Sequence, residues 1–157
     1  MIKIRPAVKE DAKHIHRLIT ELAVYEKLEH EMEATIEELE SSIFEKDQAS
    51  VLIAEYNNEV VGYALYFLSY STFLAKAGIY LEDLYVEKIH RGKGIGKRLL
   101  SSLAKITVEN GYGRLEWSVL DWNKPAIDFY RSIGAESLDG WTTNRLTGNY
   151  LKKLALI

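Results

Sequence analysis

A run of glycines between a predicted strand and a predicted helix constrains the fold of this chain more than any other feature. The run reads Arg91-Gly92-Lys93-Gly94-Ile95-Gly96. Apolar residues recur behind it at helical spacing until Asn110-Gly111, which predicts a helix over residues 94–110. The stretch 79–86 in front of it is rich in aromatic and branched residues and predicts a buried strand. The local order is therefore strand, glycine loop and helix.

Glycines at the start of a helix favour an anion site. They let an anion approach the main chain, and the unpaired N–H groups of the first turn carry the positive end of the helix dipole. The spacing excludes a Walker loop, because Arg91 and Arg98 stand where that motif needs Gly and Ser or Thr. It also excludes a dinucleotide fingerprint, because Lys97 and Leu99 stand where a third glycine belongs. A turn that only caps the helix is the alternative that the loop alone leaves open.

Length and charge limit the class of protein. The 157 residues fit one domain, residues 1–157, with a single core. With 20 basic and 23 acidic residues the net charge is −3, so we expect no nucleic-acid or membrane partner. A chain with this charge is better suited to a small cationic substrate. The absence of cysteine excludes an acyl-cysteine mechanism, and the four histidines lack metal-ligand spacing, so no metal is predicted. The lack of a long apolar segment predicts a cytosolic protein.

The remaining pattern predicts a mixed α/β domain of order β-α-α-β-β-β-α-β-α-β-β. A capping box at Thr35-x-x-Glu38 marks the start of the second helix, which is predicted to run through Leu39 and Ile43. Asn57-Asn58 predicts a tight hairpin turn. Asn123 is the predicted cap of the last helix, which Gly134 ends. The predicted strands cover residues 2–5, 51–56, 60–68, 79–86, 114–120, 136–143 and 146–154.

Several stretches resemble one known family. They are Ile4-Arg5-Pro6-Ala7, Glu21-Leu22-Ala23-x-Tyr25-Glu26, Tyr80-Leu81-Glu82-Asp83, the glycine loop, and Asn123-x-x-Ala126-x-x-x-Tyr130. Together with the element order they resemble the GCN5-related N-acetyltransferases (GNAT), and within these the diamine branch of spermidine/spermine and thialysine N-acetyltransferases. The resemblance covers essentially the whole chain. It implies the GNAT fold, a twisted and mostly antiparallel central sheet flanked by helices, with acetyl-CoA as co-substrate and a homodimer as the assembly.

The resemblance also implies roles for single residues. Glu82 would be the base, acting through ordered water, Tyr130 the acid for the departing thiolate, and a backbone amide around Leu84 the donor to the developing oxyanion. A base is needed because only about one alkylamine molecule in a thousand is unprotonated at neutral pH. The implied coenzyme-binding residues are Leu84, Tyr85, Val86, Arg91, Gly92, Lys93, Gly94, Ile95, Gly96, Lys97, Asn123, Lys124, Pro125 and Ala126. The implied acceptor-binding residues are Tyr25, Glu26, Glu82, Asp83, Glu116, Trp117 and Asp139.

The predicted function is direct transfer of an acetyl group from acetyl-CoA to a primary amine of a small cationic acceptor, either a diamine or polyamine or a thialysine- or lysine-like amino acid. The stretch Tyr70-Ser71-Thr72-Phe73 looks more like the thialysine branch, because Ser71 stands where spermidine/spermine enzymes carry an acidic residue. Structural alternatives stay open, with Tyr130 a core aromatic and Glu82-Asp83 a solvated strand end. Functional alternatives are acetylation of a protein lysine or N-terminus, and a coenzyme-binding regulator without turnover.

Overall fold

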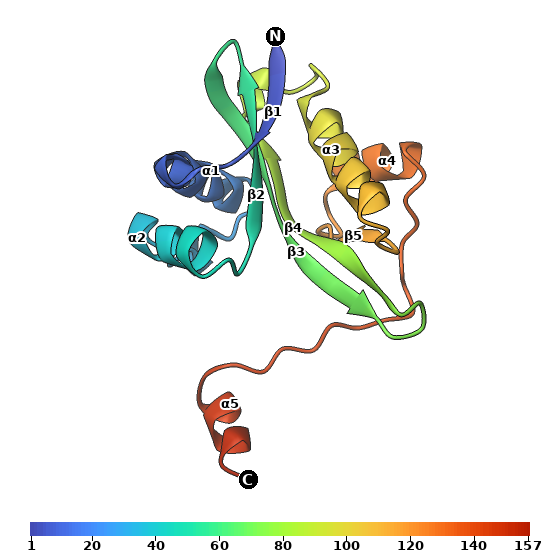
Figure 1. The fold of residues 1–157 in the computed structure, drawn as a ribbon. Coiled ribbons are helices and arrows are strands. Elements are labelled where there is room, and N and C mark those ends of the chain that lie inside the picture. Colours follow the sequence, from blue (N-terminus) through green and yellow to red (C-terminus); the bar gives the residue numbers. More distant parts are fainter. The chain divides into compact units, whose positions relative to one another are not determined.

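The computed structural model describes residues 1–157, which form two compact units, Met1–Ser118 and Val119–Ile157 (Figure 1). The first unit holds β1 (Ile2–Pro6), α1 (Ala12–Tyr25), α2 (Ile36–Leu39), β2 (Ser50–Tyr56), β3 (Glu59–Ser71), β4 (Lys76–Val86), α3 (Ile95–Glu109) and β5 (Leu115–Trp117). The second holds α4 (Lys124–Ser132) and α5 (Gly148–Ala155).

The first unit is built on a five-stranded sheet of order β1-β2-β3-β4-β5. Strands β1 to β4 pair antiparallel in sequence, and β5 joins β4 in parallel. Helices α1 and α2 cover one face of the sheet and α3 covers the other (Figure 1). Because both faces are covered, Val51–Ala54 of β2 is buried at every position rather than at every second one. The predicted mixed α/β fold with a mostly antiparallel sheet is confirmed.

The local signals for turns and helix starts are confirmed as well. Asn57 and Asn58 adopt φ angles of 51° and 69°, as a tight hairpin turn between β2 and β3 requires. Thr35 accepts a hydrogen bond from the backbone N–H of Glu38, whose side chain accepts one from the N–H of Thr35. The sequence predicts this turn and this helix start correctly because capping and turn formation depend on a few neighbouring residues only.

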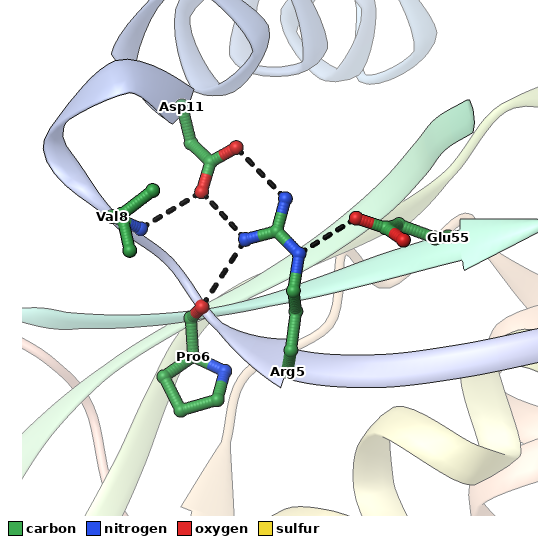
Figure 2. Close-up of polar contacts among 5 residues, drawn as sticks. All are labelled: Arg5, Pro6, Val8, Asp11 and Glu55. Atoms are coloured by element: carbon green, nitrogen blue, oxygen red, sulfur yellow. Dashed lines mark hydrogen bonds and ion pairs between the residues drawn. The ribbon is translucent and has the colours of Figure 1, made fainter. Parts of the chain in front are cut away.

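One ion-pair network fixes the start of the chain to the sheet. Arg5 of β1 donates to both carboxylate oxygens of Asp11, at 2.7 and 3.0 Å, and to Glu55 of β2 at 2.6 Å (Figure 2). The Asp11 carboxylate also accepts the backbone N–H of Val8 at 2.8 Å, and the Arg5 guanidinium donates to the carbonyl of Pro6 (Figure 2). The network holds β1, the entry to α1 and β2 in one arrangement.

The sequence prediction was wrong near the C-terminus. Residues 136–143 form no strand, and residues 146–154 contain most of α5 rather than a strand. The apolar residues Tyr150, Leu151 and Leu154 are spaced at three and four positions, which favours a helix, and Lys152 and Lys153 in its last turn complement the helix dipole.

Two other elements differ from their predicted extent. The predicted strand 114–120 is shortened to β5, Leu115–Trp117. The predicted second helix is α2 followed by a π-helical turn, Glu40–Glu45, that buries Ile43.

Candidate active site

The glycine loop opens α3 with its main chain exposed. Gly92 and Gly94 adopt φ angles of 82° and 83°, a left-handed conformation that other residues rarely adopt. A Cβ placed on either glycine would meet nothing within 4 Å, so the space above the loop is open. The first turn-closing hydrogen bond runs from the N–H of Arg98 to the carbonyl of Gly94, so the preceding N–H groups have no helical acceptor. These N–H groups and the open space at Gly92 and Gly94 fit a bound diphosphate.

The cationic side chains of this loop are turned toward aromatic rings. The Arg91 guanidinium lies 4.7 Å from the ring centre of Tyr25 and 5.2 Å from that of Tyr85, and its Nε donates to the carbonyl of Val86 at 2.9 Å. The Lys93 ammonium lies 4.9 Å from the ring centre of Tyr56. An open hollow of about 350 Å³ adjoins the Arg91 stack and is lined by Thr20, Glu21, Val24, Tyr25, Tyr85, Lys88 and Arg91.

Strand β4 has a free edge just before the loop. Its residues Ile79–Leu81 pair with β5, whereas Asp83–Val86 pair only with β3. The N–H of Glu87 donates to the carbonyl of Val61, which sets the alternation so that the backbone groups of Leu84 and Val86 point away from β3. The N–H and C=O of Leu84 and the N–H of Val86 are positioned to pair with an extended ligand laid along the strand, whereas the Val86 carbonyl already accepts the Arg91 Nε–H.

A β-bulge lies where the two halves of β4 meet. Leu65 faces Asp83 while the next residue, Tyr66, faces Leu81, so Glu82 is the extra residue and has no partner on β3. Bulges redirect side chains and interrupt pairing. The Glu82 side chain is exposed at this point. The main candidate base therefore lies at the position where the strand changes from two partners to one.

Carboxylates gather around the bulge on the face covered by α1. Burial raises the pKa of Asp83, while the hydrogen bond that Tyr63 donates to it at 2.9 Å opposes the rise. Burial also raises the pKa of Glu26, at the end of α1, and the charges of Asp83 and Glu82 raise it further. The mutual repulsion of these three predicted site residues makes the cluster a favourable place for a cation.

The other predicted residues have their own local partners. Glu116 of β5 forms an ion pair with Arg114 at 3.3 Å, and its neighbour Trp117 is half-buried. In the second unit Asn123 caps α4 by accepting the N–H of Ala126, which confirms the predicted cap. Lys124 pairs with Asp128 at 2.7 Å, Pro125 occupies the first turn of α4, Tyr130 lies within α4, and Asp139 lies beyond it.

Sequence reasoning missed one residue of the cluster. Tyr63 of β3 is completely buried, and its hydroxyl reaches Asp83, which is on the same face of the sheet as Tyr63. In the sequence Tyr63 stands in an apolar strand and looks like any core aromatic. Only the register of β3 against β4 reveals its polar role.

The similarity of this chain to known proteins shows that it is an acyl-transferring enzyme. The sequence model of the Acetyltransferase (GNAT) family matches residues 12–135. The chain belongs to this family, as the resemblance predicted. GNAT acetyltransferases use acetyl-CoA as co-substrate, and this enzyme is an N-acetyltransferase of amines.

Similar proteins match along nearly the whole chain. The thialysine N-epsilon-acetyltransferase of Bos taurus is 39% identical, covering 98% of this chain and 97% of its own length. L-ornithine N5-acetyltransferase NATA1 of Arabidopsis thaliana is 33% identical, covering 97% of this chain and 87% of its own. A solved integron cassette protein from the mobile metagenome of V. cholerae has a TM-score of 0.82 at 29% identity, covering 98% of this chain and 97% of its own.

Two further findings concern metals and membranes. The chain contains no group of three or more His, Cys, Asp and Glu side chains arranged to hold a metal ion. None of its helices combines the length and apolar character needed to cross a membrane.

Proposed function

We propose that this enzyme transfers the acetyl group of acetyl-CoA directly to a side-chain primary amine of a small cationic acceptor of the thialysine, lysine or ornithine type, with diamines and polyamines as weaker acceptors. The observation that carries the proposal is the cluster of Glu26, Glu82 and Asp83 beside the free edge of β4. Carboxylates whose charges disfavour one another favour an ammonium group.

The donor would be held mainly by main-chain groups. The open N–H groups after Gly94 suit a diphosphate, and the outward groups of Leu84 and Val86 suit the amide-bearing pantetheine arm. Tyr85 and the other coenzyme-binding residues predicted from the sequence, Arg91 to Lys97 and Asn123 to Ala126, belong to this proposal. Acetyl-CoA supplies the activated acetyl group.

The acceptor must lose a proton before it can react. In this proposal Glu82 removes it through a water molecule, and Asp83 and Glu26 hold the cationic acceptor. A backbone N–H near Leu84 stabilises the negative charge that develops on the acetyl oxygen, and Tyr130 donates a proton to the departing thiolate. Tyr25, Glu116, Trp117 and Asp139 complete the proposed acceptor residues.

Ser71 supports an amino-acid acceptor over a long polyamine. Its side chain is buried and accepts the backbone N–H of Leu74 at 3.2 Å, so it stabilises the turn between β3 and β4. It provides no negative charge for a distant ammonium group. The relatives named for thialysine and ornithine point the same way.

An amine panel tests the proposal. Free thiol release from acetyl-CoA is measured with thialysine, lysine, ornithine, putrescine, spermidine, spermine and a lysine-containing peptide. We expect the highest kcat/KM for the single amino acids. A peptide that exceeds all of them would overturn the proposal in favour of protein acetylation.

The proposed acid is tested by Tyr130→Phe. Loss of a general acid should lower kcat about 100-fold, while the Kd for acetyl-CoA stays unchanged. Phe129→Leu in the same helix is the matched control for altered packing. An unchanged kcat in Tyr130→Phe would remove Tyr130 from the mechanism.

A single catalytic domain and a cytosolic location remain predictions of the sequence, and a homodimer remains what the family resemblance implies. The match of the family to residues 12–135 supports one domain, because it extends from the first compact unit into the second. Sedimentation equilibrium measures the assembly, and we expect twice the mass of the 18.0 kDa chain.

A further inference from the structure

The fully buried phenol of Tyr63 reaches the carboxylate cluster of Glu26, Glu82 and Asp83 from the core. Tyr63 is 0% exposed and packs among residues of α1, α2 and β2, yet its hydroxyl donates to Oδ2 of Asp83 at 2.9 Å. A buried hydroxyl needs a partner, and a phenylalanine would fill the same core space without one. The hydroxyl therefore points to a function at Asp83.

The bond leaves Asp83 in a defined orientation. Tyr63 and Asp83 lie on one face of the sheet, and Tyr63 faces Tyr85, so the phenol approaches Asp83 diagonally from the neighbouring strand. With Oδ2 occupied, Oδ1 is the oxygen that remains for a ligand. A carboxylate held at one oxygen loses little further freedom when it binds a cation.

We propose that Tyr63 is a positioning residue for the acceptor, holding Oδ2 of Asp83 so that Oδ1 receives the ammonium group of the amine. This inference rests on the proposed function, in which Asp83 binds the acceptor. It adds a residue of the buried core to the determinants of amine affinity.

The charges around Asp83 give Tyr63 a second effect. Burial and the charge of Glu82 raise the pKa of Asp83, and the hydrogen bond from Tyr63 lowers it. Glu26 at the end of α1 also faces this group, and Tyr85 lies beside the phenol. Tyr63 thus helps to keep Asp83 ionised beside two other carboxylates. Removing the hydroxyl moves the protonation of Asp83 to higher pH.

Tyr63→Phe tests the inference, with Tyr66→Phe as the matched control. Tyr66 lies three residues along β3 on the opposite face, so the control removes a hydroxyl from the same strand without touching Asp83. In Tyr63→Phe we expect the KM for the amine to rise about tenfold, with kcat and the KM for acetyl-CoA unchanged. The rise in amine KM at low pH should also begin at a higher pH than in the wild type. Tyr66→Phe should change none of these values.

A double-mutant cycle separates positioning from general damage. Once Asp83→Asn has removed the charge, adding Tyr63→Phe should raise the amine KM by less than about twofold. Equal effects in both backgrounds, or an unchanged amine KM in Tyr63→Phe, would overturn the inference. Acetylation of no amine by the wild type would instead overturn the proposed function.

Discussion

The carboxylate cluster lies at one end of the free-edged stretch of β4, residues 83–86, and the glycine loop follows the other end after the turn Lys88–His90. The two are built on different principles. At the loop, the exposed groups are main-chain N–H groups, and the nearby Arg91 and Lys93 side chains lie against aromatic rings. At the cluster, the chemistry belongs to the side chains of Glu26, Glu82 and Asp83. The loop depends on backbone conformation, and the cluster depends on side-chain identity.

In the proposed function, this difference lets one fold serve several amines. A site made of backbone groups survives most substitutions, provided that its glycines stay. A site made of side chains changes with each replacement. The similar proteins reported above are named for thialysine and for ornithine, which are different amines. The first three changes below should each affect one of these two sites and spare the other, and the fourth should affect neither.

The largest effect is expected at the cluster. Glu82→Gln should lower kcat about 100-fold at neutral pH, because a general base is lost, and should leave the Kd for acetyl-CoA unchanged. The deficit should narrow at alkaline pH, where more of the amine is already unprotonated. Steady-state rates across pH, with calorimetry for the coenzyme, measure both. Glu59→Gln at the start of β3 is the control, and a deficit independent of pH would contradict the assignment.

Gly94→Val should break the loop and spare the cluster. A branched residue at a φ of 83° is strained, and its side chain enters the space above the N–H groups, so the Kd for acetyl-CoA should rise at least about tenfold. Gly111→Val, at a φ of 68° beyond the other end of α3, is a control for the strain alone. Lys93→Ala should raise the Kd for acetyl-CoA about threefold at most, because the main-chain N–H groups of the loop remain in place. A larger loss of acetyl-CoA affinity in Lys93→Ala than in Gly94→Val would contradict the view that main-chain groups dominate binding at the loop.

Glu26→Gln should weaken acceptor binding mildly and stabilise the protein. We expect the amine KM to rise about threefold, as for loss of a partly exposed charge. Because burial and two neighbouring charges raise the pKa of Glu26, ionising it costs stability once the pH exceeds its ordinary 4.5. The variant should therefore melt at a higher Tm than the wild type at pH 7, with the difference vanishing below about pH 4. Equal Tm values for Glu26→Gln and the wild type at pH 7 would contradict the repulsion of Glu26 by Asp83 and Glu82.

Asp11 lies outside both the glycine loop and the carboxylate cluster, so Asp11→Asn should affect stability alone. Breaking the Arg5 network should lower the free energy of unfolding by about 2 kcal/mol, with both KM values unchanged. The hydrogen bond from Arg5 lowers the pKa of Asp11, so its contribution is complete above the ordinary 3.8 and disappears as the pH falls through the lowered value. Urea unfolding at pH 7 and pH 3 measures this, and Glu10→Gln is the exposed neighbouring control. A difference that does not shrink at pH 3 would be the contrary result.

The prediction from sequence succeeded where a few adjacent residues decide the structure. Gly94, Thr35 and Asn57 each signalled a helix start or turn that the structure contains. It failed at residues 136–143, which are exposed and pair with no strand. The segment has only two large apolar residues, Leu138 and Trp141, and the Asp139-Gly140 between them disfavours a strand.

The candidate site divides in the same way. The glycine loop and the Glu82-Asp83 pair were visible in the sequence as motifs. The bulge at Glu82, the stacking of Arg91 on Tyr25 and Tyr85, and the bond from Tyr63 were not. Each of these depends on which residues of distant segments face one another.

By itself, the sequence determined the order of elements in the first unit, the glycine loop before α3 and the family, because backbone conformation and local periodicity are properties of neighbouring residues. Only the tertiary structure decided how the acidic residues are used. A shift of one residue in the pairing of β3 with β4 turns a side chain to the other face, so the contact between Tyr63 and Asp83 exists only in the folded sheet.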